Sequence, residues 1–266
     1  MNRYYGVFKR IKENYPELIN EYPLYYKEAA DLYDCLIFNN RDADFFIQQA
    51  LVHGGSALEL CCGSGRITLP FLKAGLKVTA VDLSEDMLSN LEENLNNRKY
   101  SRVRKNLTVV KGDMTKLELD NKKYNIIIIG ATSIRLVDEN FEDFFNDMYE
   151  LLDEGGCLVF DFEDLPMKDS TEQLVEPMIV MDYMNKDNKL SLIYMQRIFE
   201  YKEKRAFVNA MRVVPVSEEK ILLSHIDYRI FGMEDLKHAA EKSKFGSCEI
   251  IEVPEYDNYF CKMIKK

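Results

Sequence analysis

The sequence predicts an α/β protein with a parallel sheet and, late in the chain, a β-rich segment. Three observations predict this fold class. An apolar run at 57–60 leads into a small-residue turn with two glycines and then into a helical pattern. Further apolar runs at 77–82, 107–111 and 124–129 each end in a polar or glycine-containing turn. Residues 174–230 instead lack a helical period and divide into short runs rich in β-branched and aromatic residues.

The residues before the first strand predict three helices. Residues 2–20 carry aromatic and aliphatic side chains at close to helical spacing, and Tyr15-Pro16 bends or ends this helix. Pro23 is expected to open a second helix. A third helix is expected from Asp42 to His53, where Gly54 and Gly55 stop it.

The turn after the first strand has the composition of a ligand-binding loop. Glycines let a backbone turn tightly and approach a ligand closely, and the following helix presents free N–H groups. A dinucleotide fingerprint would place a third glycine at position 68, which is Thr68 here. Glu59 stands just before the loop, where a pyrophosphate would be repelled. A ligand with an amino group and a sulfonium tolerates this acid.

Acids at the next two strand ends fit a nucleoside. Asp82 ends the second strand, about 20 residues after the loop, where an acid reaches ribose hydroxyls. Leu83 and Met87 follow it and are suited to flank a flat base. Asp113, after the third strand, can accept a hydrogen bond from an adenine amino group.

Together these pieces resemble the motifs of class I S-adenosylmethionine (SAM)-dependent methyltransferases. The resemblance rests on Glu59–Arg66, Val81–Ser84, Gly112–Met114 and Gly130-Ala131. It implies a Rossmann-like seven-stranded sheet with an N-terminal helical lid and a β-rich antiparallel cap. It also implies SAM as cofactor and S-adenosylhomocysteine (SAH) as product. The cofactor-binding residues that it implies are Tyr33, Glu59, Gly63, Gly65, Arg66, Asp82, Leu83, Met87, Asp113, Met114, Gly130 and Ala131.

We therefore expect four parts along the chain. Residues 1–40 form the helical lid, 41–165 the SAM-binding core and 166–230 the antiparallel cap. Residues 231–266 return to the core with a helix and a closing pair of strands. The elements expected within the core are helices from Ser84 to Leu95 and from Phe141 to Leu152, a fifth strand at 157–161, a helix at 232–244, and strands at 248–253 and 259–264.

Composition narrows the function. A net charge of −10 on 266 residues disfavours non-specific binding to nucleic acid, which needs a cationic surface. The six cysteines form no C-x-x-C pair and are expected to be reduced, and the three histidines have no metal-ligand spacing. Without a signal-peptide pattern or a membrane-spanning apolar run, the sequence predicts a cytoplasmic enzyme without a membrane partner. It sets no oligomeric state, and a monomer is compatible with it.

The methyl acceptor is expected at two strand ends, 131–135 and 161–164. The second holds three carboxylates in four residues. Three interpretations stay open: a pocket for a cation such as a guanidinium, a divalent metal site as in some catechol-type O-methyltransferases, or a solvated loop. Asp161 is the best placed of the three acids, because it lies at the strand end itself.

The whole chain further resembles the α-N-methyltransferases that finish linear azole-containing peptides of the plantazolicin type. The residues that carry this narrower resemblance are the tyrosine-rich start at 4–26, the segment 131–135 and the acidic stretch at 161. It implies dimethylation of the α-amine of an N-terminal arginine. The alternatives are a small-molecule O- or N-methyltransferase and, from another class, a SAM-binding protein without turnover.

The expected mechanism requires few catalytic groups from the protein. An α-amine has a pKa near 8, so a useful fraction is neutral near pH 7, and positioning and water exclusion supply most of the acceleration. Asp161 is the predicted catalytic residue, which orients the amine; whether it also takes a proton stays open. The predicted substrate-binding residues are Tyr4, Phe8, Tyr26, Phe38, Thr132, Arg135, Asp161, Glu163 and Tyr183.

Overall fold

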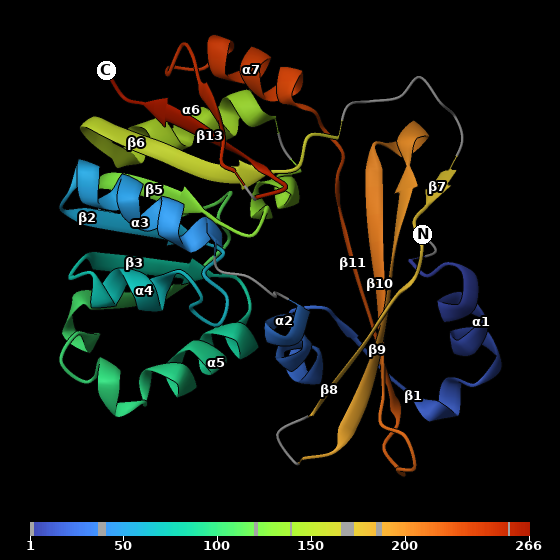
Figure 1. Ribbon diagram of the computed structural model, residues 1–266. Coiled ribbons are helices and arrows are strands. Elements are labelled where there is room, and N and C mark those ends of the chain that lie inside the picture. The colour runs from blue at the N-terminus through green and yellow to red at the C-terminus, as the bar shows by residue number, and fades with distance from the viewer. Residues whose placement is uncertain are drawn as a thin grey trace. The chain divides into compact units, whose positions relative to one another are not determined.

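The computed structural model describes residues 3–36, 41–119, 122–138, 140–165, 173–184, 188–254 and 256–266 (Figure 1). The chain divides into two compact units. Unit 1 combines Met1–Phe38 with Met167–Ile230, and unit 2 combines Asn39–Pro166 with Phe231–Lys266. None of the helices among the described residues has the length and apolar content needed to cross a membrane.

Unit 2 is built on a seven-stranded sheet with the order β12-β13-β6-β5-β2-β3-β4. Its strands are β2 (Ser56–Leu60), β3 (Lys77–Asp82), β4 (Leu107–Lys111), β5 (Tyr124–Ile129), β6 (Leu152–Phe162), β12 (Glu249–Glu252) and β13 (Tyr259–Ile264). Strands β2 to β6 are parallel to one another, whereas β13 runs antiparallel to both β6 and β12. The predicted α/β fold with seven strands is confirmed. The carboxyl ends of five parallel strands therefore meet at one edge.

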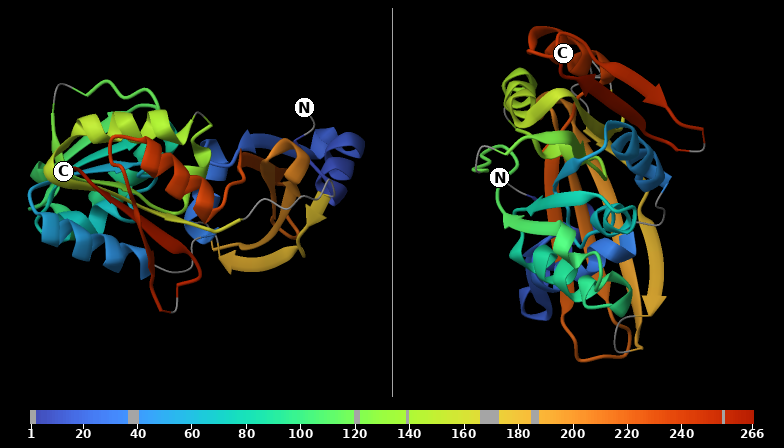
Figure 2. Two further views of the ribbon diagram at one scale, coloured as in Figure 1. Left: turned by 90° about the horizontal axis from the view of Figure 1, so that it is seen from above. Right: turned by 90° about the vertical axis from the view of Figure 1, so that its left-hand side faces the viewer.

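Helices cover both faces of this sheet (Figures 1 and 2). One face packs against α3 (Arg41–His53), α4 (Thr68–Lys73) and α5 (Glu85–Leu95), and the other against α6 (Phe141–Leu151) and α7 (Met233–Lys242). Alternate strand residues serve opposite faces, so Ile127 lies in one buried cluster and Ile128 in the other. Burial on both faces explains why the sequences of the central strands are continuous apolar runs.

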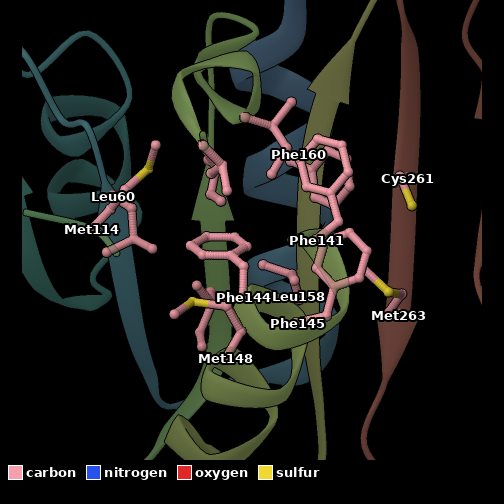
Figure 3. Close-up of a cluster of buried hydrophobic side chains, with 14 of the residues drawn as sticks. Leu60, Met114, Phe141, Phe144, Phe145, Met148, Leu158, Phe160, Cys261 and Met263 are labelled. Atoms are coloured by element: carbon pink, nitrogen blue, oxygen red, sulfur yellow. The ribbon is translucent and has the colours of Figure 1, made fainter. Parts of the chain in front are cut away.

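Aromatic rings dominate the core between the sheet and α6 (Figure 3). Phe144 and Phe145 of α6 are fully buried, as is Phe160 of β6. The Phe145 and Phe160 rings are stacked, with centroids 6.0 Å apart. The same cluster includes Leu60 of β2 and Met263 of β13. It thus joins β2 to the closing strand β13, which lies about 200 residues later in the chain.

Unit 1 contains a six-stranded sheet. Its strands are β1 (Ile19–Pro23), β7 (Gln173–Val175), β8 (Ile179–Met184), β9 (Leu190–Glu200), β10 (Arg205–Val213) and β11 (Ile221–Arg229). Strands β9, β10 and β11 form an antiparallel meander, and β7 and β8 pair with successive stretches of β9. Helices α1 (Gly6–Asn14) and α2 (Ala30–Leu36) belong to the same unit.

The expectation of helices alone before residue 40 is corrected by β1. This strand joins the sheet in parallel to β11, with Ile19 opposite Ile221 and Pro23 opposite His225. Pro23 ends the strand instead of opening a helix, and α2 begins only at Ala30. Because β1 is the edge strand, the missing N–H of its proline costs no ladder bond.

Tyr4 and Phe8 belong to the core of unit 1, which corrects their predicted contact with the acceptor. Their exposed fractions are 2% and 0%, and both pack in a cluster with Met211 and Leu223. The Tyr4 hydroxyl and His225 Nδ1 are hydrogen-bonded at 3.0 Å. Aromatic residues at helical spacing here reflect packing of the N-terminal segment on its own sheet.

Gly65, in the loop before α4, illustrates how closely that loop packs on α5. Its φ is +92°, and a Cβ built there would lie 2.3 Å from Leu91 Cδ1. Gly75 has a similar φ of +85° but open space around it.

Gly65→Ala is expected to lower the free energy of unfolding by about 2–5 kcal/mol, since left-handed strain and overpacking both act. Gly75→Ala, the matched control, should cost only about 1–2 kcal/mol, from backbone strain alone. Urea unfolding of both variants measures the difference. Equal losses would show that the packing of Gly65 against Leu91 has no energetic weight.

Candidate active site

Most of the predicted site residues come together at the carboxyl edge of the parallel strands in unit 2. This edge includes the loop after β2, the end of β3, the turn after β4, the turn after β5 and the end of β6. Ligands of open α/β sheets bind at such an edge. The predicted residues found on it or beside it are Glu59, Gly63, Gly65, Arg66, Asp82, Leu83, Met87, Asp113, Met114, Gly130, Ala131, Thr132, Arg135, Asp161 and Glu163.

Asp82 holds the glycine loop against the end of β3. Its Oδ2 accepts a hydrogen bond from the Gly63 N–H at 2.8 Å, and its Oδ1 accepts one from the Ser84 N–H at 2.9 Å. The Cys62 N–H also donates to the Val81 carbonyl at 3.0 Å. Burial raises the pKa of Asp82 above its ordinary value, while the backbone donors oppose that rise. Each carboxylate oxygen keeps a lone pair that can accept from a ligand hydroxyl.

Glu59 is an acid buried inside the sheet, with an exposed fraction of 2%. It accepts a hydrogen bond from the Thr68 hydroxyl at 2.6 Å. Burial raises the pKa of Glu59 from 4.5 to about 8, against the lowering effect of Thr68 and Arg66. Thr68, which stands in place of the third glycine of a dinucleotide fingerprint, therefore donates a hydrogen bond to this acid. The sequence pattern did not indicate this role.

The turn after β4 is held by its own side chains. Asp113 Oδ1 accepts hydrogen bonds from both the N–H and the hydroxyl of Thr115, each at 2.9 Å. Met114 Sδ accepts from the Cys61 thiol at 3.4 Å. Of the two residues predicted to flank a base, Leu83 is 54% exposed but Met87 is only 1% exposed. Leu83 is therefore free to contact a ligand, whereas Met87 is a core residue.

Arg66, a predicted cofactor ligand, is also engaged within the protein. Its guanidinium makes a bidentate pair with the carboxylate of Asp42 in the first turn of α3, with both N–O distances at 2.5 Å. The Asp42 side chain is almost fully buried. This pair fixes α3 to the glycine loop. The sequence does not indicate this pair, because an aspartate at the start of a predicted helix is typical of a helix cap.

The turn after β5 has an unusual backbone. Ala131 and Thr132 have φ values of +53° and +55°, a region that residues with a Cβ seldom adopt. The Thr132 N–H donates to Asp161 Oδ1 at 2.9 Å. Asp161 is fully buried at the end of β6, and its Oδ2 accepts from the Tyr256 hydroxyl at 2.8 Å.

The acidic stretch at 161–164 is not an open cluster of carboxylates. Asp161 has the two donors just described, Glu163 forms an ion pair with Arg135 at 3.0 Å, and Asp164 accepts from the Met233 N–H at the start of α7. Each acid thus has a structural partner, which argues against the first of the three open interpretations, a pocket of free carboxylates for a cation. In the described part of the chain, no group of three or more His, Cys, Asp or Glu side chains is arranged to hold a metal ion.

The remaining predicted residues belong to unit 1. The Tyr33 ring lies edge-on to that of Tyr25, with centroids 5.4 Å apart. Tyr183, on β8, packs against a buried cluster that contains Leu32. Tyr26 precedes α2, and its N–H donates to the Pro23 carbonyl. Phe38, the last predicted acceptor contact, lies outside the described residues.

The acidic side chains at this edge fit SAM better than they fit a pyrophosphate. Carboxylates stand in or after three consecutive strands, at Glu59, Asp82 and Asp113, and the nearby Arg66 is neutralised by Asp42. A pyrophosphate site would need donors and positive charge, whereas SAM brings hydroxyls, amino groups and a cationic sulfur.

Comparison with known proteins agrees with this assignment. Residues 57–156 match the family model described as a methyltransferase domain. With the fold and the edge described above, this match identifies residues 57–156 as a SAM-dependent methyltransferase domain; the fold is that of class I methyltransferases, and SAM is the cofactor.

Individual relatives are distant. The chain is 22% identical over 201 residues to the Bacillus subtilis (strain 168) protein named "Putative methyltransferase YqeM", covering 70% of this chain and 78% of that one. A SAM-dependent methyltransferase from Clostridium acetobutylicum superposes with a TM-score of 0.66 at 19% identity, covering 89% and 97% of the two chains. The glycopeptide N-methyltransferase MtfA, solved with SAH, superposes with a TM-score of 0.59 at 19% identity, covering 99% of each chain.

Glu59→Gln is expected to change how stability depends on pH. Because the folded pKa of about 8 exceeds the ordinary 4.5, the folded state binds more protons between these values. The contribution of Glu59 to the free energy of unfolding is therefore full below pH 4.5 and is lost as pH rises to 8, at up to about 1.4 kcal/mol per pH unit.

The glutamine variant keeps an acceptor for Thr68 and removes this titration. Urea unfolding of the SAM-free proteins between about pH 5 and pH 8 should give a steeper decline for the wild type than for the variant. Parallel pH profiles would mean that Glu59 titrates as an ordinary exposed acid.

Proposed function

We propose that the chain transfers a methyl group from SAM to the nitrogen of an amine, carried by a small molecule or a peptide. The observation that supports nitrogen is that the three acids at 161–164 are all engaged with protein partners. An amine needs no strong base, because part of it is neutral near pH 7. A hydroxyl acceptor needs a positioned base or a metal ion to remove its proton.

The comparison with MtfA also supports nitrogen as the atom that receives the methyl group, since that protein is an N-methyltransferase of similar fold. Bound SAM supplies an activated methyl group on a cationic sulfur. In our proposal Asp82 accepts hydrogen bonds from the ribose hydroxyls, and Asp113 with Leu83 contacts the adenine. Glu59, which is largely protonated near pH 7 without a ligand, becomes ionised when the cationic SAM binds and balances the positive charge of the methionine part. The turn at 130–132 borders the methyl-transfer edge. Positioning of a neutral amine in line with the sulfur–carbon bond then accounts for most of the acceleration.

Asp161 takes a different role in this proposal from the one predicted. A fully buried carboxylate with a donor on each oxygen is better suited to position the turn after β5 than to take a proton from the acceptor. Burial raises its pKa to about 6, so it is mostly ionised near pH 7 and can accept both bonds.

An N-terminal arginine in an azole-containing peptide is the narrower candidate, and its α-amine fits the same chemistry. Its guanidinium calls for an unpaired carboxylate. Among the described residues of the acidic stretch none is unpaired, because Glu163 already binds Arg135. The peptide therefore enters the test as one acceptor among several amines.

The test is a mass-shift assay with SAM on a matched panel. Its members are an amino sugar, an amino acid amide, a peptide with N-terminal arginine followed by an azole, the same peptide with lysine in place of arginine, the acetylated form of each, and hydroxyl analogues. We expect methyl gain on one or more free amines and none on the acetylated or hydroxyl forms.

Transfer to a hydroxyl analogue alone would contradict the amine proposal and leave the methyltransferase assignment in place. Transfer to nothing in the panel, with SAM binding intact, would count against an amine of these kinds. Gain on the arginine peptide but not on its lysine counterpart would support the peptide reading.

A further inference from the structure

The turn after β5 stores backbone strain at the edge where methyl transfer is proposed. Ala131 and Thr132 are consecutive non-glycine residues in the left-handed region, with φ of +53° and +55°. Each such residue is disfavoured, and strain of this kind persists only when the surroundings hold it. Two neighbouring bonds are local, from the Ser133 N–H to the Gly130 carbonyl and from the Arg135 N–H to the Thr132 carbonyl.

Asp161 ties the backbone of the turn to the end of β6. Its Oδ1 accepts the Thr132 N–H at 2.9 Å, and its side chain is fully buried. A hydrogen bond to an ionised carboxylate is stronger than one between neutral groups, so the turn is held best while Asp161 is charged.

Tyr256 supplies the second donor to this carboxylate. It lies in the connection between β12 and β13, and its hydroxyl donates to Asp161 Oδ2 at 2.8 Å. Its ring stacks on that of Phe260, with centroids 5.1 Å apart. The Phe260 ring in turn packs on the Phe45 ring of α3, with centroids 4.0 Å apart. Phe260 is also the β13 residue paired with Asp161 across the sheet. The hydroxyl is therefore presented from a rigid stack.

The charged groups near Asp161 have opposite effects on its ionisation. Asp42 disfavours its ionised form, whereas Arg66 favours it, and these two are paired with each other. The Thr132 N–H and the Tyr256 hydroxyl both favour ionisation against the cost of burial. Removal of the hydroxyl is thus expected to tip Asp161 toward its protonated form near neutral pH.

We infer that Tyr256 is a positioning residue for methyl transfer, which acts by orienting the Asp161 carboxylate that holds the Ala131–Thr132 turn. It contacts no reacting atom, and its effect on the reaction passes through Asp161 and the Thr132 backbone. The link to methyl transfer rests on the proposed function, but the link between the hydroxyl and the turn does not.

The test compares Tyr256→Phe with the wild type by NMR. The Asp161 carboxyl carbon should titrate at a higher pH in the variant, because a bond that favours the charged form is gone. At one fixed pH the Thr132 amide should exchange its hydrogen with solvent about tenfold faster. With an active acceptor, kcat should fall by roughly tenfold near neutral pH while the KM for SAM changes less than about twofold.

Tyr259→Phe is the matched control, because it removes a hydroxyl three residues away that bonds to no residue in the described ranges. It should leave all these values unchanged. Asp161→Asn should abolish the carboxyl titration and make Tyr256→Phe silent in kcat. The proposal is overturned if the Asp161 titration and the Thr132 exchange rate are unaltered in Tyr256→Phe. Both NMR readouts need no acceptor, so they remain decisive if the amine proposal fails.

Discussion

The hydrogen bond from the Gly63 N–H to the Asp82 carboxylate is the contact on which the rest of the site depends. At 2.8 Å it ties the loop after β2 to the end of β3, across strands that pair in parallel. The left-handed φ values of Cys61, Gly63 and Gly65 let the loop make this approach. The Arg66–Asp42 pair then attaches α3 to the same loop. One half-buried acid, Asp82, therefore fixes the loop geometry and still keeps lone pairs for a ligand.

Those parts of the fold that rest on local pattern could be predicted from the sequence. Strands such as β5 are continuous apolar runs because helices bury both faces, and α6 carries its phenylalanines on one side. The edge strand β1 could not be predicted, because its five residues are polar or mixed and gain their structure only by pairing with β11, some 200 residues later.

For the site, the same distinction holds. Glu59, Asp82 and Asp113 follow strands whose ends are visible in the sequence, so their common edge could be predicted. The partners of the other charged groups could not be predicted. Whether Arg66 faces a ligand or Asp42, and whether Asp161 is open or covered by Tyr256, depends on the packing of α3 and of the β12–β13 connection. No short motif encodes those contacts, so the sequence left a cation pocket, a metal site and a solvated loop all open for the acid-rich stretch at 161–164.

The most direct test of this account is the affinity for SAM of Asp82→Ala, measured by isothermal titration calorimetry beside the wild type. We predict a loss of about 10- to 100-fold, the value of one or two hydrogen bonds to a charged acceptor. The loss should occur in a protein that still unfolds cooperatively. Unchanged affinity in a folded variant would contradict the assignment of this edge as the SAM site.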